Sequence, residues 1–376
     1  MQPKAARNIS IEALRLIAVA GIAVFHTFQW TFQATCVGLP EYAPLAAFPY
    51  SGVLGFINLL GCWANEVFFM ISGYFLIASA ARAWDGGTTW KSQMQRTSQR
   101  LGKVVMPTAL YCLVALAWST VVSPIPDVTL NTHYWYTLGL EFIWVYAATV
   151  FMAPWFGLAK CRLSQKSYTT TVIAVGILAF VVNGYLAAMS ATSAGEFSWL
   201  QKLMSAATYV IAFLIGGLLR DVTDAVDSDR AGALGMRSLA AVLALATILE
   251  GALSFTGNLT AMAALSYKST SLISFALAAA SLLFAATRRS ASGNPRTAGV
   301  IVTLSTATLG FYVMQSLTSS LWRPVFNTLL ANMLVSQNSP AAICIITGTV
   351  ISTVFALALL IIDAARSLIV RKLKRQ

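Results

Sequence analysis

Two side chains that can do chemistry, Arg15 and His26, lie eleven positions apart in the first strongly apolar stretch of this chain. Because an α-helix has about 3.6 residues per turn, eleven positions make close to three turns, and both side chains project from one face. The axial rise between them is about 16 Å, over half of the ~30 Å hydrocarbon core of a bilayer. A guanidinium and an imidazole are costly to bury there, so the pair indicates chemistry within a membrane.

Carboxyl groups fall in the same early part of the chain. Glu12 lies three positions before Arg15, a spacing at which the two charges pair on one helix. Glu66 lies inside the second apolar stretch and Glu141 at the start of the fourth. A histidine is a suitable general base for a hydroxyl, and a nearby carboxylate can orient its ring or stabilise the imidazolium. We therefore predict His26, Glu66 and Glu141 as catalytic residues.

Each of these residues also has an ordinary structural explanation when taken alone. A single membrane histidine often bonds a neighbouring helix, and an arginine such as Arg15 near an interface often anchors the topology by snorkelling. Glu141 can be a solvated residue at a helix end. The combination of these residues, rather than any one of them, favours a chemical role.

The composition is that of an integral membrane protein. Of the 376 residues, 57% are hydrophobic and only 10% are charged, whereas about a quarter of a soluble domain is charged. The apolar stretches predict an all-α integral membrane protein with about ten transmembrane helices, forming a single domain over residues 1–376. The candidate helices are 11–30, 54–81, 104–122, 134–158, 168–190, 203–219, 238–256, 270–287, 299–321 and 340–364.

The net charge of +12 reports topology rather than a nucleic-acid partner. If both termini face the cytoplasm, the inner loops hold most of the Lys and Arg residues, and the outer loops hold only Lys202, Lys268 and Arg323. This alternation follows the positive-inside rule, so we predict that both termini are cytoplasmic, and we expect a lipid bilayer and no nucleic acid as partner. Because the chain has two histidines and no cysteine pair with metal-ligand spacing, we also predict no metal site.

Two further segments carry candidate binding residues. In the basic stretch 91–103, Arg96, Arg100 and Lys103 share one face of a helix, which can lie in the headgroup layer or bind a phosphorylated ligand. The aromatic residues Tyr134 and Trp135 can stack on a sugar ring, but the favoured interpretation is an aromatic belt at the membrane interface.

Motifs along nearly the whole chain, in the right order, resemble those of the membrane-integral acyltransferase 3 family. An arginine and a histidine with ten residues between them open the chain, as in that family, and 308–316 is similar to its late motif. That motif commonly ends in histidine, where this chain has Gln315. The other similar segments are 68–76, 96–107 and 134–154.

The resemblance implies transfer of an acyl group, usually acetyl from acetyl-CoA, to hydroxyls of cell-surface glycans or lipid-linked precursors. It implies a multi-pass protein of the bacterial cytoplasmic membrane, with His26 as the catalytic histidine. The residues that would meet the CoA phosphates from the cytoplasmic side are Arg15, Arg96, Arg100 and Lys103. The candidate acceptor-binding residues are Ser72, Tyr74, Tyr134 and Trp135.

Alternatives from other classes are a proton-coupled transporter or polysaccharide exporter and a non-catalytic membrane scaffold. A proton relay would need polar groups through the later spans, whereas those spans hold few ionisable residues apart from Glu250. A scaffold leaves the shared face of Arg15 and His26 unexplained. Direct transfer and an acyl-histidine intermediate are both compatible with the sequence, as are several acceptors.

Overall fold

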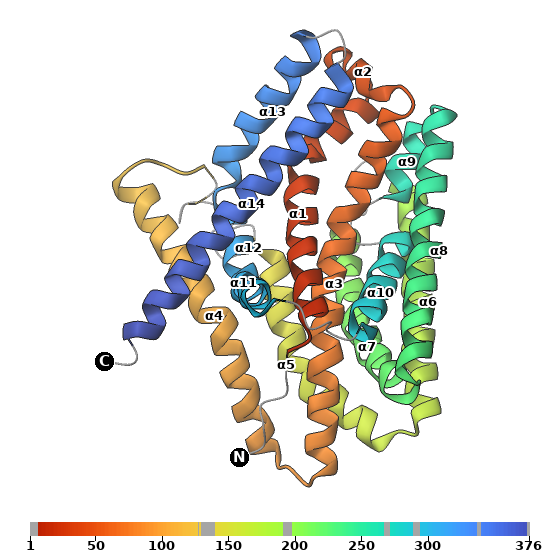
Figure 1. Ribbon diagram of the computed structural model, residues 1–376, viewed down its shortest axis with the longest axis vertical. Coiled ribbons are helices and arrows are strands. Elements are labelled where there is room, and N and C mark those ends of the chain that lie inside the picture. Colours follow the sequence, from red (N-terminus) through yellow and green to blue (C-terminus); the bar gives the residue numbers. More distant parts are fainter. Residues whose placement is uncertain are drawn as a thin grey trace.

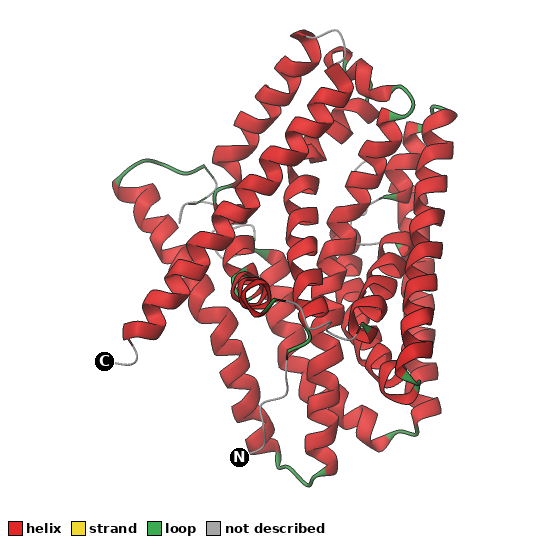
Figure 2. Ribbon diagram, in the orientation of Figure 1, coloured by secondary structure: helices red, strands yellow, loops and turns green. Residues whose placement is uncertain are grey.

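The computed structural model describes residues 7–126, 128, 140–190, 198–266, 271–288, 294–336 and 340–373. Every regular element in these ranges is a helix, as Figure 2 shows. The elements are α1 Ile9–Cys36, η1 Pro40–Tyr42, α2 Ala43–Ala46, α3 Tyr50–Asp85, α4 Trp90–Val121, α5 Glu141–Arg162, α6 Gln165–Ser190, α7 Ser198–Ala225, α8 Ser228–Phe255, α9 Leu259–Leu265, α10 Leu272–Thr287, α11 Pro295–Ser305, α12 Thr308–Leu317, α13 Ser319–Ser336 and α14 Pro340–Leu373.

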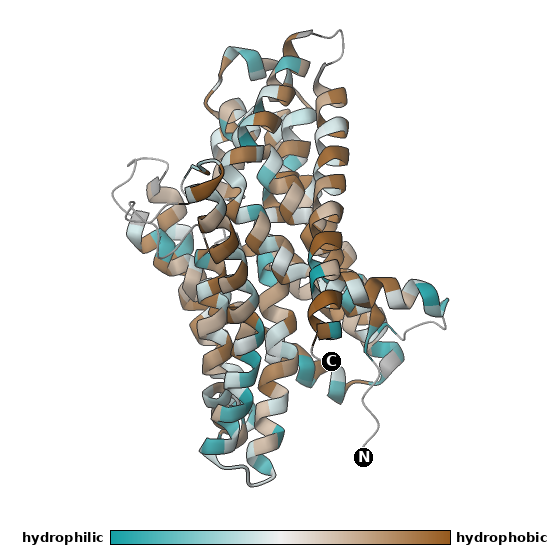
Figure 3. Cartoon of the chain, turned by 90° about the vertical axis from the view of Figure 1, so that its left-hand side faces the viewer, coloured by the Kyte–Doolittle hydropathy of each residue, from teal (hydrophilic) through white to brown (hydrophobic). Residues whose placement is uncertain are grey.

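The helices confirm an all-α integral membrane protein. Within the described ranges, eight helices are long and apolar enough to cross a membrane, or nine if α11 and α12 count as one bent span. The apolar helix α10 is shorter, with 16 residues. Each of the ten predicted segments therefore holds a helix, and hydrophobic residues recur along the long ones (Figure 3).

Several predicted bounds differ from those of the observed helices, and two spans differ most. The segment 299–321 is not one helix, because the chain bends by 42° between α11 and α12 and continues into α13. In Figure 1, α11 is seen end-on, so it lies across the long axis of the molecule. The segment 104–122 is part of the longer helix α4, which begins at Trp90 because the Thr89 side chain accepts a hydrogen bond from the Ser92 backbone N–H. The basic stretch 91–103 thus continues directly into a membrane helix.

Helix α3 lies at the centre of the bundle and packs against α1, α5, α7, α8 and α10 (Figure 1). Glycines allow its closest approach to α7. A Cβ atom at Gly73 would overlap the Phe213 carbonyl group, and one at Gly216 would overlap the Met70 carbonyl group. Such small residues let two membrane helices bring their backbones together. Gly73 therefore serves helix packing, while its neighbour Ser72 points to a different side.

The start of α1 is fixed by its N-cap. The Asn8 side-chain oxygen accepts hydrogen bonds from the backbone N–H groups of Ser10 and Ile11, at 2.9 and 3.3 Å. Its Nδ2 donates to the Ala286 carbonyl oxygen at 3.3 Å, which ties α1 to the end of α10. Glu12 then places a negative charge in the first turn, where the helix dipole favours it. These contacts set the height of Arg15 within the bundle.

Candidate active site

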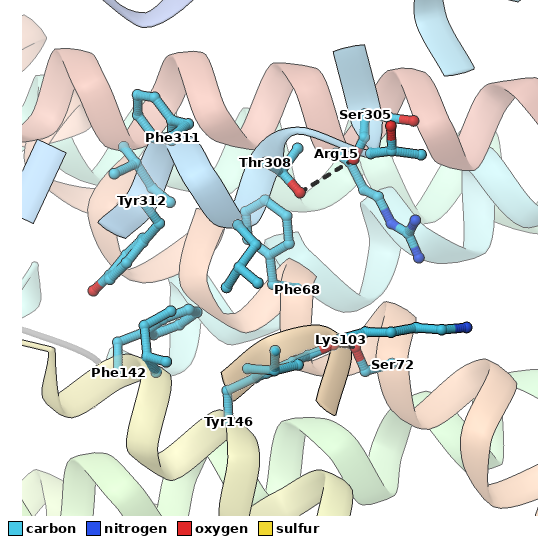
Figure 4. A pocket seen from close by; sticks show the side chains of 15 residues that line it. Arg15, Phe68, Ser72, Lys103, Phe142, Tyr146, Ser305, Thr308, Phe311 and Tyr312 are labelled. Carbon is cyan, nitrogen blue, oxygen red and sulfur yellow. Dashed lines mark hydrogen bonds between the residues drawn. The ribbon is translucent and has the colours of Figure 1, made fainter. Parts of the chain in front are cut away.

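A cavity of about 350 Å³ lies beside α1, between α3, α4, α5 and the break that joins α11 to α12. Figure 4 shows that its lining side chains come from all of these elements. The lining residues used below are Arg15, Ile22, Phe68, Ser72, Lys103, Phe142, Tyr146, Ser305, Thr308, Phe311 and Tyr312.

One end of the cavity is cationic. Arg15 of α1 and Lys103 of α4 both line it, and their charged groups lie at the same end in Figure 4. Arg15 Nη1 also donates to Glu12 Oε2 at 3.0 Å, the pairing that the sequence predicts. Because guanidinium has five donors and ammonium three, both groups keep donors for an anionic ligand. This end suits phosphate groups.

The other walls are mainly aromatic. The rings of Phe142 and Tyr312 stack with centroids 4.4 Å apart. Ser72 Oγ and the Tyr146 hydroxyl lie 2.9 Å apart and form a hydrogen bond between α3 and α5. Phe68 and Phe311 complete the apolar surface. An extended, mostly apolar chain with a few polar groups would fit such walls.

The helix break explains how polar backbone reaches this depth. Thr308 Oγ1 donates to the Ser305 carbonyl oxygen at 3.2 Å, the contact drawn in Figure 4. Both residues line the cavity. Interrupted helices are tolerated at membrane depth where they are buried in protein or line a cavity. The break at 306–307 therefore belongs to the site and is not a loop between two ordinary spans.

His26 lies beyond the end of this cavity. It follows Ile22, a lining residue, by four positions, so Arg15, Ile22 and His26 share one face of α1. Its Nδ1 lies 3.1 Å from Nη2 of Arg323 on α13. Gln29 is a second hydrogen-bonding neighbour of the imidazole, and the residue as a whole is half-buried. The cationic end and the histidine are therefore separated along α1, with the aromatic part of the cavity between them.

The other two predicted phosphate-binding residues lie outside the cavity lining. Arg96 is exposed, and Arg100 Nη2 donates to Ser79 Oγ on α3 at 3.3 Å. Arg100 precedes Lys103 by three positions and is half-buried, so it lies one helical turn from the lining residue. Its role in ligand binding stays a prediction.

The two predicted catalytic carboxylates do not contact the imidazole. Glu66 is fully buried in α3, and neither of its side-chain oxygens has a hydrogen-bond partner among the described residues. Glu141 is exposed at the first turn of α5. The charged side chain beside His26 Nδ1 is Arg323 rather than a carboxylate. The catalytic roles of Glu66 and Glu141 stay predictions.

Of the two predicted acceptor-binding residues that the structure describes, Ser72 lines the cavity and Tyr74 does not. The Tyr74 hydroxyl lies 2.8 Å from Thr223 Oγ1 in a hydrogen bond, and the Arg220 guanidinium lies 5.1 Å from the centre of its ring. These contacts hold Tyr74 in a second, smaller pocket between α3, α7, α8 and α10. Tyr134 and Trp135 lie outside the described residues.

Two charged residues with contacts inside the bundle, the half-buried Arg323 and the buried Asp363, were not singled out in the sequence. Arg323 is one of the few basic residues that the sequence assigns to outer loops. This exception to the positive-inside pattern was the one feature of the sequence that could have marked it as a candidate. Asp363 of α14 is 1% exposed, and its Oδ1 accepts hydrogen bonds from Tyr111 and Arg366, each at 2.7 Å. The later helices thus hold more charged residues than the sequence argument against a transporter assumed.

The fold and this cavity define a multi-pass helical membrane protein with an internal site that is cationic at one end. The family model described as an acyltransferase domain, that of the acyltransferase 3 family, matches residues 8–360, nearly the whole chain. The chain therefore belongs to this family and is a membrane acyltransferase. No curated protein and no solved structure matches the chain. Family membership decides for an enzyme over the transporter and scaffold alternatives.

Proposed function

We propose that this protein is an O-acetyltransferase that moves acetyl from cytoplasmic acetyl-CoA to a hydroxyl of a cell-surface polysaccharide or lipid-linked glycan, in the cytoplasmic membrane of a bacterium. One observation carries the proposal. The two lining cations, Arg15 and Lys103, lie at one end of an aromatic-walled cavity, and His26 lies one helical turn beyond the lining residue Ile22, on the face of α1 that also carries Arg15.

The separation of these groups suits a long acyl donor. In the proposed complex, Arg15 and Lys103 hold the phosphates of CoA, and the rings of Phe142 and Tyr312 pack along the pantetheine arm. The rise of about 16 Å from Arg15 to His26 is of the order of an extended pantetheine arm. The thioester would then reach the histidine, while the acceptor approaches from the opposite side of the membrane.

The chemistry proposed for this site is direct acyl transfer. The acceptor hydroxyl attacks the thioester carbonyl carbon while His26 takes the hydroxyl proton as general base. The developing negative charge on the carbonyl oxygen requires hydrogen-bond donors. Collapse of the tetrahedral intermediate breaks the C–S bond, and CoA leaves with the proton as a free thiol.

The test is acetyl transfer by the purified protein in nanodiscs, with acetyl-labelled acetyl-CoA and a bacterial cell-envelope extract. We expect label to enter a glycan fraction with the wild type and to be lost with His26→Ala. Lys202→Ala serves as the control, because this exposed lysine of α7 lines no described pocket. Full transfer by a correctly inserted His26→Ala protein would contradict the proposal, as would a folded wild type that neither transfers acetyl nor releases CoA.

A further inference from the structure

The contact between Arg323 and His26 determines which imidazole nitrogen is free to act as a base. Nη2 of Arg323 lies 3.1 Å from Nδ1 of His26. A guanidinium can only donate hydrogen bonds and stays protonated in proteins. Nδ1 must therefore hold a lone pair, and in the neutral ring the proton resides on Nε2. Nδ1 is thus the nitrogen that can accept a proton.

Arg323 has a second donor with no partner. Its Nε atom is buried and makes no hydrogen bond to any described residue. A buried donor of a charged group costs free energy when it is left unpaired, so an orphaned guanidinium N–H calls for an explanation. The unpaired N–H and the N–H on Nη2 belong to one planar group, and the second of these faces the base. Arg323 can therefore present donors to a ligand that lies next to His26 Nδ1.

Arg323 also connects the histidine to the cavity. It lies within range of electrostatic interaction with Tyr312, which lines the end of the cavity remote from Lys103 (Figure 4). The guanidinium lies 5.6 Å from the centre of the Trp322 ring, and Trp322 Nε1 donates to the Gln315 carbonyl oxygen at 3.0 Å. These contacts connect the start of α13 to α12, the helix that carries Tyr312.

We propose that Arg323 is the oxyanion donor of the acyl transfer and that its bond to His26 Nδ1 marks the reaction centre in the ligand-free enzyme. This inference rests on the proposed function. When substrates bind, the acceptor hydroxyl replaces Nη2 at Nδ1, and the Arg323 N–H groups turn to the thioester oxygen.

The proposed step transfers the acyl group from the CoA sulfur to the acceptor oxygen, with one proton carried by His26. The acceptor oxygen forms a bond to the carbonyl carbon, its proton moves to His26 Nδ1, and the carbonyl π electrons move to the oxygen beside Arg323. The electrons then return, the C–S bond breaks, and the CoA sulfur takes the proton from Nδ1. The products are the O-acyl ester and the free thiol. Arg323 donates hydrogen bonds throughout and exchanges no proton.

A kinetic comparison separates this role from a purely structural one. Arg323→Met removes the donors, while Arg323→Lys keeps a positive charge and three donors. Because loss of one oxyanion donor typically slows catalysis by about 10²–10³-fold, we expect kcat to fall in this range for Arg323→Met. KM for acetyl-CoA should stay within about twofold, because the phosphate-binding residues lie at the other end of the cavity. We expect Arg323→Lys to recover part of kcat.

The nitrogen assignment has its own readout, independent of activity. The chain has only two histidines, so ¹⁵N-histidine labelling of a His133→Gln protein reports His26 alone. We expect an Nδ1 signal typical of a lone-pair nitrogen and an Nε2 signal typical of N–H in the protein with Arg323. In Arg323→Met the constraint is gone, and the two tautomers should mix. A protonated Nδ1 in the presence of Arg323 would overturn the proposal.

The remaining outcomes distinguish this inference from the function on which it rests. If the wild type transfers acetyl and Arg323→Met does so with unchanged kcat, the role of Arg323 is wrong while the proposed function stands. If the wild type is folded and transfers nothing, both are wrong. A fall in kcat that accompanies an equal rise in KM and a lost Nδ1 signal in Arg323→Lys would indicate a structural anchor only.

Discussion

Arg15 and Lys103 come from helices far apart in the sequence, yet their charged groups lie at the same end of one cavity (Figure 4). The ion pair with Glu12 holds Arg15 in place. Lys103 is the last residue of the basic stretch 91–103 of α4. Two cations at one end of a cavity with mainly aromatic walls are the entry site that we propose for a phosphorylated donor. In this proposal the donor extends from that end along α1 towards His26.

We predict that Arg15→Ala and Lys103→Ala each raise KM for acetyl-CoA by about 10–100-fold, because each removes charge-assisted hydrogen bonds of about 1.5–3 kcal/mol. The kcat values should change little. The measurement is steady-state acetyl transfer in nanodiscs at fixed salt. Lys91→Ala is the matched control, since this exposed lysine lies on α4 but outside the cavity lining.

The same variants can be tested with acetyl-pantetheine, a donor without the CoA phosphates. If Arg15 and Lys103 bind phosphate, replacing either one with Ala should leave KM for acetyl-pantetheine unchanged. An equal rise in KM for both donors would mean that Arg15 and Lys103 support the fold of the site instead. Glu12→Gln then isolates the contribution of the ion pair to the position of Arg15.

A second prediction concerns Ile22, which lines the cavity one turn before His26 and is 1% exposed. A donor that extends from Arg15 to the histidine must pass this side chain. We expect Ile22→Trp to lower the rate of acetyl transfer at least tenfold. Acetyl-CoA should still bind, which isothermal titration calorimetry measures. Ile22→Ala opens space, so it should improve transfer of butyryl relative to acetyl. Unchanged transfer by Ile22→Trp would contradict this path.

The sequence predicted the helices well because membrane spans depend on local properties, chiefly hydropathy over some 20 residues. It also placed Arg15, Ser72 and Lys103 among the candidate residues, and these three line the cavity. The spacing of Arg15 and His26 needed only the helical repeat. The break between α11 and α12 was missed because both halves are apolar, and hydropathy alone does not register a bend of 42°.

The sequence alone did not predict which residues of distant helices contact one another. Arg323 lies 297 positions after His26, and no local pattern reports which of several outer basic residues turns inward. Tyr74 shows the converse case. It follows Ser72 by two positions, and because two positions turn a helix by about 200°, the two side chains cannot share a face. Its motif suggested a ligand, whereas its contacts are with Thr223 and Arg220.

That position gives a third prediction. Tyr74→Phe should leave kcat and both KM values within about twofold of the wild type, because the lost hydroxyl bonds Thr223 and Arg220 and lies outside the cavity. The free energy of unfolding should fall by about 1–3 kcal/mol for the two missing hydrogen bonds. Ser72→Ala provides the contrast, since it changes the cavity wall. A tenfold rise in the KM for the acceptor in Tyr74→Phe would restore Tyr74 as a binding residue.

The last prediction tests the packing that holds α3 in place. At Gly73 a methyl group would overlap the Phe213 carbonyl group, so Gly73→Ala must push α3 and α7 apart. Overpacking of this kind costs about 1–3 kcal/mol, and we expect the midpoint of thermal unfolding to fall by roughly 3–10 °C.

Gly184→Ala is the matched control, because a Cβ atom added at this exposed glycine of α6 would have no neighbouring atom within 4 Å. Alanine should be neutral or stabilising there, since glycine costs about 0.5–1 kcal/mol in a helix interior. Equal unfolding midpoints for the two variants, measured by tryptophan fluorescence in the same detergent, would show that α3 and α7 tolerate separation. In that case the close contact at Gly73 would not be what fixes Ser72 at the cavity wall.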